Sequence, residues 1–292
     1  MIGSKNMNKI KIFGDSTLDL SEELCEKYGV TLIPLTVLIG GTSYKDGVEI
    51  QPQQIFEYVD KTGELPKTAA VNSEIYKETW GPYLNEGYDI IHFNISSDMS
   101  TCYQSACIAA KEIAPDHVFV IDTANLSTGS ALLALYAADL IQQGLPAKEI
   151  AEKCQKRVPS VQASFILDRL NYLHKGGRCS SIALLAASAL SIKPSIRVKG
   201  GKMGASKKYI GKFLSCTEKY VKDLLVDFST PDYTRVFITH TSVPAEVVAR
   251  IKEILSAYPF KEILDTNAGC TISSHCGPCC IGVLFINDGD QK

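Results

Sequence analysis

The fold is decided by residues 88–106, YDIIHFNISSDMSTCYQSA. Apolar residues at 90–95 predict a buried strand, and small and apolar residues at helical spacing from Cys102 onward predict a helix. The turn between them is polar and contains Ser96, Ser97, Asp98, Ser100 and Thr101. Because a helix start has unpaired N–H groups and a partial positive charge, this turn can cap the helix, hold an anionic group, or do both.

The same order of strand, polar turn and helix recurs in the first half of the chain. Residues 9–13 predict a strand before Asp15-Ser16-Thr17, and residues 117–121 predict one before the hydroxyl-rich turn 122–129. Alternating strands and helices are typical of a parallel α/β sheet, whose ligands bind beyond the carboxyl ends of the strands. We therefore expect four hydroxyl-bearing turns to gather on one edge: 15–17, Thr68, 96–101 and 123–128.

Several local predictions test this interpretation. Residues 31–39 are apolar and β-branched, which predicts one strand, and residues 43–47 predict a polar loop. A proline after Leu65 predicts a loop through Thr68. His92 and His117 lie within apolar strands, so we expect both to be core residues.

The second half is organised less regularly. Predicted strands at 163–167, 192–198, 234–239, 262–264 and 281–285 are mixed with helices, among them a very apolar helix at 182–189. The chain of 292 residues is long enough for about two domains. The prediction is therefore an α/β protein with an N-terminal parallel-sheet, three-layer domain (8–160), a C-terminal α+β domain with a mixed sheet (161–288), and the ligand between them.

Composition and charge restrict the class of partner. With 30 basic and 32 acidic residues the net charge is −2, so no strong field attracts nucleic acid, and we expect no nucleic-acid partner. The longest mostly apolar run, 182–190, is too short to cross a bilayer, which predicts no integral membrane segment. Ten irregularly spaced cysteines without a secretory h-region predict free thiols in the cytoplasm.

Sequence motifs for chemistry are few. The chain has no Walker loop, dinucleotide-binding glycine turn, G-x-S-x-G elbow or H-E-x-x-H pair, so we predict a binding protein without a cofactor or catalytic residues. A serine hydrolase that uses the 96–100 turn would need a base, and His275 is the only candidate. The basic turn Lys175-Gly176-Gly177-Arg178 is either a flexible loop or the source of an arginine that neutralises an acid.

The segment Cys276-Gly277-Pro278-Cys279 supports three interpretations. It can be a thiol redox loop, because CGPC is the loop of thioredoxin-like proteins. It can contribute to a metal site with Cys270 and His275, which are suitable zinc ligands. Finally, it can be a tight turn that aims His275 at the domain interface.

An ordered set of short segments, each weak alone, resembles the DegV family of fatty-acid-binding proteins over about residues 9–285. The segments include Asp15-Ser16-Thr17, Tyr44-Lys45-Asp46, Pro66-Lys67-Thr68, Ile95-Ser96-Ser97, Asp122-Thr123, Leu173-His174-Lys175-Gly176-Gly177-Arg178, Ile192-Lys193-Pro194 and His275-x-Gly277-Pro278.

The resemblance implies that a long-chain, palmitate-like fatty acid lies between two domains, with its acyl chain in an apolar tunnel. Thr68 matches the threonine of the family's K-T-S-Q turn, and Ser100 the second serine of its S-x-L-S-G-T turn. Arg178 and His275 match residues near the carboxylate, and Ser97 completes the expected ligand-binding set. The resemblance also implies a carrier in lipid metabolism that presents the acid to a fatty-acid kinase.

The chain departs from the family pattern at several positions. Ala69 and Thr101 replace a serine and a glycine beside the expected hydroxyls, and Cys279 replaces a glycine. Residues 204–211 lack the arginine of many kinase-docking members. We therefore expect partial retention of head-group binding and altered kinase contacts, with the apolar segment 182–192 available to line the tunnel.

Overall fold

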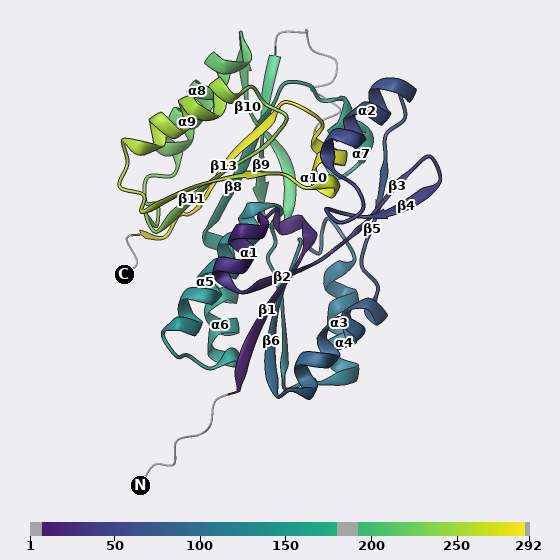
Figure 1. Ribbon diagram of the computed structural model, residues 1–292. Coiled ribbons are helices and arrows are strands. Elements are labelled where there is room, and N and C mark those ends of the chain that lie inside the picture. Colours follow the sequence, from purple (N-terminus) through teal and green to yellow (C-terminus); the bar gives the residue numbers. More distant parts are fainter. Residues whose placement is uncertain (1–7, 180–191, 290–292) are drawn as a thin grey trace.

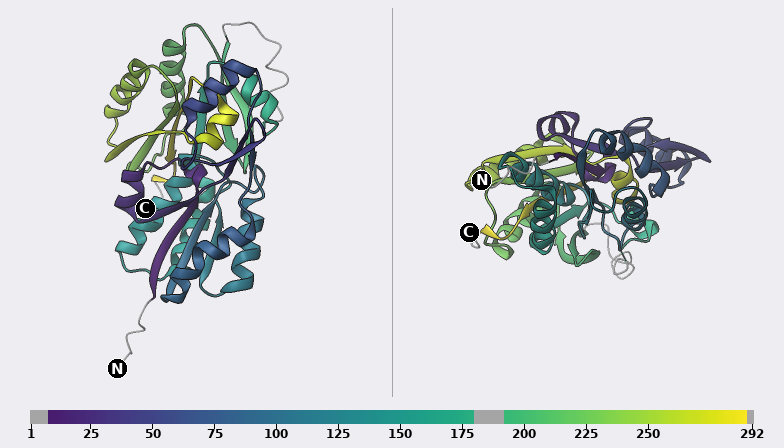
Figure 2. Two further views of the ribbon diagram at one scale, coloured as in Figure 1. Left: turned by 45° about the vertical axis from the view of Figure 1, so that its right-hand side comes forward. Right: turned by 90° about the horizontal axis from the view of Figure 1, so that it is seen from below.

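The computed structural model describes residues 8–179 and 192–289, and its elements form two α/β halves (Figures 1 and 2). The strands are β1 (Lys9–Asp15), β2 (Val30–Ile33), β3 (Thr36–Ile39), β4 (Thr42–Lys45), β5 (Lys67–Ala69), β6 (Tyr88–Asn94), β7 (Val118–Asp122), β8 (Val161–Leu167), β9 (Ile192–Lys199), β10 (Lys202–Ile210), β11 (Arg235–Thr241), β12 (Glu262–Asn267) and β13 (Cys280–Ile286). The α-helices are α1 (Glu22–Tyr28), α2 (Pro52–Thr62), α3 (Ser73–Asn85), α4 (Cys102–Ile113), α5 (Thr128–Gln142), α6 (Ala147–Arg157), α7 (Asn171–Gly176), α8 (Phe213–Asp227), α9 (Ala245–Ser256) and α10 (Cys270–Cys276), with short 3-10 turns at Ser16–Leu18 and Val158–Ser160.

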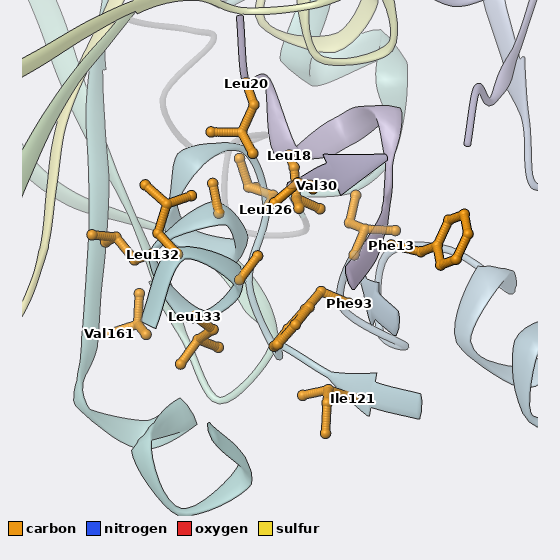
Figure 3. Packing of buried hydrophobic residues seen from close by; sticks show 14 of the residues in the cluster. Phe13, Leu18, Leu20, Val30, Phe93, Ile121, Leu126, Leu132, Leu133 and Val161 are labelled. Atoms are coloured by element: carbon orange, nitrogen blue, oxygen red, sulfur yellow. The ribbon is translucent and has the colours of Figure 1, made fainter. Parts of the chain in front are cut away.

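The first half contains a parallel sheet in the order β2-β1-β6-β7. Helices α3 and α4 pack on one face, and α5 and α6 pack on the other (Figure 1). Figure 3 shows part of the apolar core between the sheet and α5, where Phe93 points toward Leu133. Phe13 points to the opposite face of the sheet, where its ring packs on Tyr83 of α3. The predicted parallel α/β sheet is therefore confirmed, and its carboxyl edge carries the turn after β6.

The second half contains a six-stranded mixed sheet in the order β10-β9-β8-β13-β11-β12. Only β11 and β12 pair in parallel, which confirms the predicted mixed sheet. Helices α8 and α9 pack beside this sheet, while α5 of the first half contacts β8, β11 and β13. Residues 131–135 of α5 are fully buried because this helix lies between two sheets, and its exposure is confined to Tyr136, Asp139 and its last two residues.

A third sheet, β4-β3-β5, is antiparallel and was not predicted. The prediction of a single strand at 31–39 is wrong, because the chain bends at Pro34 and Leu35 between β2 and β3. Pro34 has no N–H for a ladder, and the Leu35 N–H donates to Ser16 Oγ instead. Two predicted loops are also partly wrong. Most of β4 lies within the loop predicted at 43–47, and Thr68 lies in β5.

The third sheet and α2 pack on α7 and α10, so a segment of the first half shares a small core with the second half. Helix α10 was not predicted from the sequence. His92 is buried as expected, but the prediction for His117 is wrong. It precedes β7, its side chain is 54% exposed, and it bonds the Asp89 carboxylate at 2.7 Å.

The helix predicted at 182–189 lies outside the described residues, and the domain boundary at 160/161 stays a prediction. Within the described part of the chain, no helix is both long and apolar enough to cross a membrane.

An ion cluster joins the end of α6 to the strands of the second half. The Arg157 guanidinium donates to the carboxylates of Asp232 and Asp288, and the three side chains are only 16%, 8% and 13% exposed. Burial by itself would raise the pKa of Asp232, but hydrogen bonds from Arg157 and Thr234 outweigh it and lower the pKa to about 2. Arg157 thus compensates the charge of two poorly exposed carboxylates.

We expect Arg157→Met to lower the free energy of unfolding by about 3–5 kcal/mol, because it removes the guanidinium that bonds two poorly solvated carboxylates. Arg250→Met is the matched control, since Arg250 pairs with Glu218 and Glu253 on the surface, and its loss should be much smaller. Urea denaturation measures both values. Equal losses would contradict the role assigned to the buried cluster.

Candidate functional site

A cavity of about 430 Å³ opens beside the carboxyl end of β6, where the two halves meet; we call it the outer cavity. The five residues predicted to bind a ligand all line it: Thr68, Ser97, Ser100, Arg178 and His275. They come from β5, the turn before α4, the segment after α7, and α10. The fold thus brings the five together, and their role in ligand binding stays a prediction.

Thr68 and His275 form a direct pair across the two halves. The distance from Thr68 Oγ1 to His275 Nε2 is 2.9 Å. The other ring nitrogen, Nδ1, is buried and has no hydrogen-bond partner among the described residues. It faces Gly176, where an added Cβ would lie 2.7 Å from it, so this approach requires glycine. Burial, assisted by the Arg178 charge, lowers the pKa of His275 to about 4, which makes the imidazole neutral at neutral pH.

The turn before α4 supplies the remaining hydroxyls. Ser100 Oγ accepts from the Cys102 N–H at 3.3 Å and donates to Cys102 Sγ at 3.2 Å, so Ser100 caps α4 and also lines the outer cavity. Within the described ranges no hydrogen bond occupies the Ser97 hydroxyl. Ser96 is different, because its hydroxyl donates to the Gly201 carbonyl at 2.7 Å and holds the β9–β10 hairpin against the turn.

Arg178 is the cation of the outer cavity. Its guanidinium donates to the Gly176 carbonyl at 2.8 Å and has no carboxylate partner in the described part of the chain. Asp98 also lines the outer cavity, but it lies 3.6 Å from Lys202. The site therefore combines hydroxyl donors, a neutral imidazole and an arginine available for an anion.

Two of the four hydroxyl-bearing turns lie at this edge as predicted, because β1, β6 and β7 run parallel, but their hydroxyls do not reach the outer cavity. Ser16 Oγ donates to Asp46 Oδ2 at 2.9 Å, and Thr123 Oγ1 donates to the Asn94 carbonyl at 2.7 Å. Both hydroxyls are buried and satisfy internal groups. Periodicity placed the turns at the correct edge of the sheet, but it could not show which side chains point inward.

Two buried carboxylates of the first half hold the start of α10, and sequence analysis missed this arrangement. Asp46 accepts from the N–H groups of Cys270 at 2.7 Å and Thr271 at 3.2 Å. Asp19 accepts from the Gly269 N–H at 2.8 Å and from the Ser127 hydroxyl. Burial raises the pKa of Asp19 to about 8. The family resemblance included Asp19-Leu20 and Tyr44-Lys45-Asp46, but it assigned neither aspartate a role.

Sequence analysis also missed further residues that line the outer cavity. They lie on α10, which was not predicted, or on segments that only the tertiary structure brings to the cavity. They are Leu35, Ile95, Leu126, Met203, Thr271, Ile272 and Cys276. Three of them, Leu126, Ile272 and Cys276, also line a second cavity of about 30 Å³, which we call the inner cavity. Its remaining wall is mainly apolar and includes Phe165, Val198 and Leu284. Leu126, Ile272 and Cys276 form the wall between the outer cavity and the apolar inner cavity, and we call them the neck.

The cysteine loop does not have the geometry of a metal site. Cys270 Sγ faces the Ile50 carbonyl and Cys279 Sγ faces the Ser242 carbonyl, in separate surroundings. Across residues 8–179 and 192–289, no group of three or more His, Cys, Asp or Glu residues could hold a metal ion. The metal interpretation therefore has no structural support.

The geometry is also unlike that of a thioredoxin-type redox loop. Cys276 ends α10, whereas the reactive cysteine of such a loop lies at a helix start that stabilises a thiolate. Burial raises the pKa of Cys279. Cys279 has φ of 56°, a backbone region that favours glycine, which is the residue expected here from the family pattern.

Comparisons with known proteins agree over nearly the whole chain. Residues 9–288 match a family model described as "Uncharacterised protein, DegV family". A DegV domain-containing protein of Clostridium perfringens is 32% identical over 290 residues, which cover 97% of this chain and 100% of that protein. A solved structure from Thermus thermophilus, described as fatty acid binding of a DegV family protein, has a TM-score of 0.88 at 28% identity and covers 96% of this chain and 99% of that chain. A stearic-acid-binding protein from Eubacterium ventriosum has a TM-score of 0.83 at 27% identity, with coverages of 97% and 100%.

The lowered pKa of His275 predicts a pH-dependent stability. Folding lowers this pKa from 6.5 to about 4, so the stabilisation of the neutral imidazole is fully present above pH 6.5 and is lost as the pH falls toward 4. The difference in unfolding free energy between wild type and His275→Gln should therefore shrink over that interval. Urea denaturation at several pH values measures it. A difference that grows as the pH falls would refute the neutral histidine.

Asp46→Asn should loosen α10, because an amide removes the negative charge and one of the two acceptor oxygens at the helix start. We expect a loss of about 1–3 kcal/mol and faster hydrogen exchange at the amides of Cys270 and Thr271. Asp60→Asn on the exposed face of α2 is the matched control and should leave both quantities unchanged. Unchanged exchange in Asp46→Asn would show that α10 is held by other contacts.

Proposed function

Because this chain belongs to the DegV family, we propose that it binds a long-chain fatty acid and acts as its carrier. In this proposal the carboxylate lies in the outer cavity among Thr68, Ser97, Ser100, Arg178 and His275. The acyl chain passes the neck into the inner cavity between the two halves. The observation that carries the proposal is one cavity in which hydroxyls and a cation lie beside apolar side chains that the cavity shares with the inner cavity.

The energetics of a fatty acid agree with these surroundings. Each buried methylene contributes about 0.8 kcal/mol, so the acyl chain provides most of the affinity and the polar groups fix its orientation. The inner cavity of about 30 Å³ is too small for a long chain as it stands. Binding therefore requires Leu126, Ile272 and Cys276 at the neck to move apart.

Relatives described as binding fatty acids support the class of ligand. They include the Thermus thermophilus protein and the stearic-acid-binding protein of Eubacterium ventriosum, which are similar to this chain over almost its full length. We propose a saturated acid of similar length, such as palmitate. We also propose a cytoplasmic location, which the ten free thiols support.

We propose further that this chain holds the acid without changing it and presents it to a fatty-acid kinase. Its sequence has no recognisable phosphate-binding loop for ATP. At the end of β10, where the family resemblance expects a kinase-docking arginine, Ile210 is 76% exposed and Tyr209 is buried. The kinase contact then depends on an apolar side chain in place of an ion pair.

Thr68→Ala and Ser100→Ala should each weaken palmitate binding without unfolding the chain. A lost hydrogen bond to a carboxylate costs about 1.5–3 kcal/mol, which corresponds to roughly tenfold to hundredfold in affinity. Ser256→Ala is the control, because that hydroxyl bonds its own helix carbonyl at 2.8 Å and lies on the surface. Titration calorimetry measures the affinities. Wild-type affinity in both cavity variants would refute the assigned head-group site.

The palmitate-loaded protein, incubated with ATP and magnesium, should form acyl phosphate only when a fatty-acid kinase is added. The reason is that neither the outer cavity nor the sequence provides a phosphate site. Mass spectrometry of the lipid fraction detects the product. Acyl phosphate without the kinase would refute the carrier role, and no product with a kinase that serves another DegV protein would refute the presentation step.

A further inference from the structure

Two buried thiols meet at the neck between the cavities. Cys276 ends α10 and Cys280 begins β13, with three residues between them. Both side chains line the inner cavity, and Cys276 also lines the outer cavity. Burial raises the pKa of the Cys280 thiol, and the Cys276 thiol raises it further. The pairing differs from the CGPC motif, which suggested Cys276 and Cys279.

The turn between the two cysteines is held by one residue of the neighbouring strand. Thr241 Oγ1 donates to the Gly277 carbonyl and accepts from the Cys280 N–H at 3.1 Å. The Thr241 carbonyl accepts from the Cys279 N–H at 2.8 Å. These bonds keep Cys276 and Cys280 side by side and direct the Cys279 thiol toward the Ser242 carbonyl instead.

We propose that Cys276 and Cys280 form a reversible disulfide that closes the neck to the acyl chain. Hydrogen peroxide or another small hydroperoxide is the oxidant. Cys276 sulfur attacks the peroxide, which gives a sulfenic acid and water, and Cys280 sulfur then displaces the hydroxyl group as a second water. The two thiols lose two protons and two electrons in total, and the peroxide is reduced to two waters.

The surroundings favour a slow but stable disulfide and not a catalytic one. Both thiols are buried, so the peroxide must reach Cys276 through the outer cavity that Cys276 lines. Burial raises the pKa of Cys280, which makes its thiolate a poor leaving group and the disulfide slow to reduce. Cys276 and Cys280 therefore suit a stoichiometric modification.

The effect of the disulfide on fatty-acid binding follows from the position of Cys276 at the neck, and it rests on the proposed fatty-acid site. Fatty-acid binding needs Cys276 to move away from Leu126 and Ile272, whereas a disulfide ties Cys276 to β13. A bound acyl chain would in turn cover Cys276 and block the peroxide. Oxidation and lipid binding should therefore exclude each other.

The test treats lipid-free and palmitate-loaded full-length protein with hydrogen peroxide. Free thiols are blocked with iodoacetamide, disulfides are then reduced, and the released thiols are labelled with N-ethylmaleimide and mapped by mass spectrometry. We expect labels at Cys276 and Cys280 in the lipid-free protein, at least tenfold slower labelling with palmitate, and at least tenfold weaker palmitate binding after oxidation that a reductant restores.

Cys279→Ser is the matched control, because its thiol lines neither cavity, and it should behave as wild type. Cys280→Ser should abolish the paired labels. Labels that include Cys279, equal oxidation rates with and without palmitate, or unchanged affinity after oxidation would each overturn the proposal. If the reduced protein binds no fatty acid, the proposed function fails, while the map still decides which thiols pair.

Discussion

The candidate site depends on two buried carboxylates that hold a short helix from across the molecule. Helix α10 has seven residues, too few to be stable alone, and its first N–H groups would be unsatisfied without Asp46 and Asp19. Because α10 carries His275 and Cys276 into the cavities, the position of both side chains follows from this contact. The head-group site is thus formed only when the two halves are assembled.

The second constraint is α5, most of which is buried between the parallel and the mixed sheets. Leu126, just before this helix, forms part of the neck. Such close packing leaves an inner cavity far smaller than a long acyl chain. In the proposed function, ligand entry is therefore a repacking of a few side chains at the neck, and a bond that ties those side chains together would affect binding.

The polar groups of the outer cavity differ in charge because they differ in burial. Arg178 is exposed and keeps its charge available, whereas the buried His275 is neutral and bonds Thr68. A carboxylate that enters the cavity meets one cation and several neutral donors, which orient it without a second buried charge. Ser100 serves the helix and the cavity together, so the two readings of its turn are compatible.

The sequence by itself determined the parallel and mixed sheets, because hydrophobic periodicity and polar turns are local signals. It also identified five residues that line one cavity, through a resemblance carried by short motifs. Only the tertiary structure decided that Pro34 splits a strand between two sheets, that residues 270–276 are helical, and that Cys276 and Cys280 line one cavity. The physical reason is the same for all three features, because each depends on contacts between residues that are distant in sequence. Asp46 holds Cys270 at the start of α10, and Thr241 holds the turn before Cys280. No pattern of neighbouring residues contains that information.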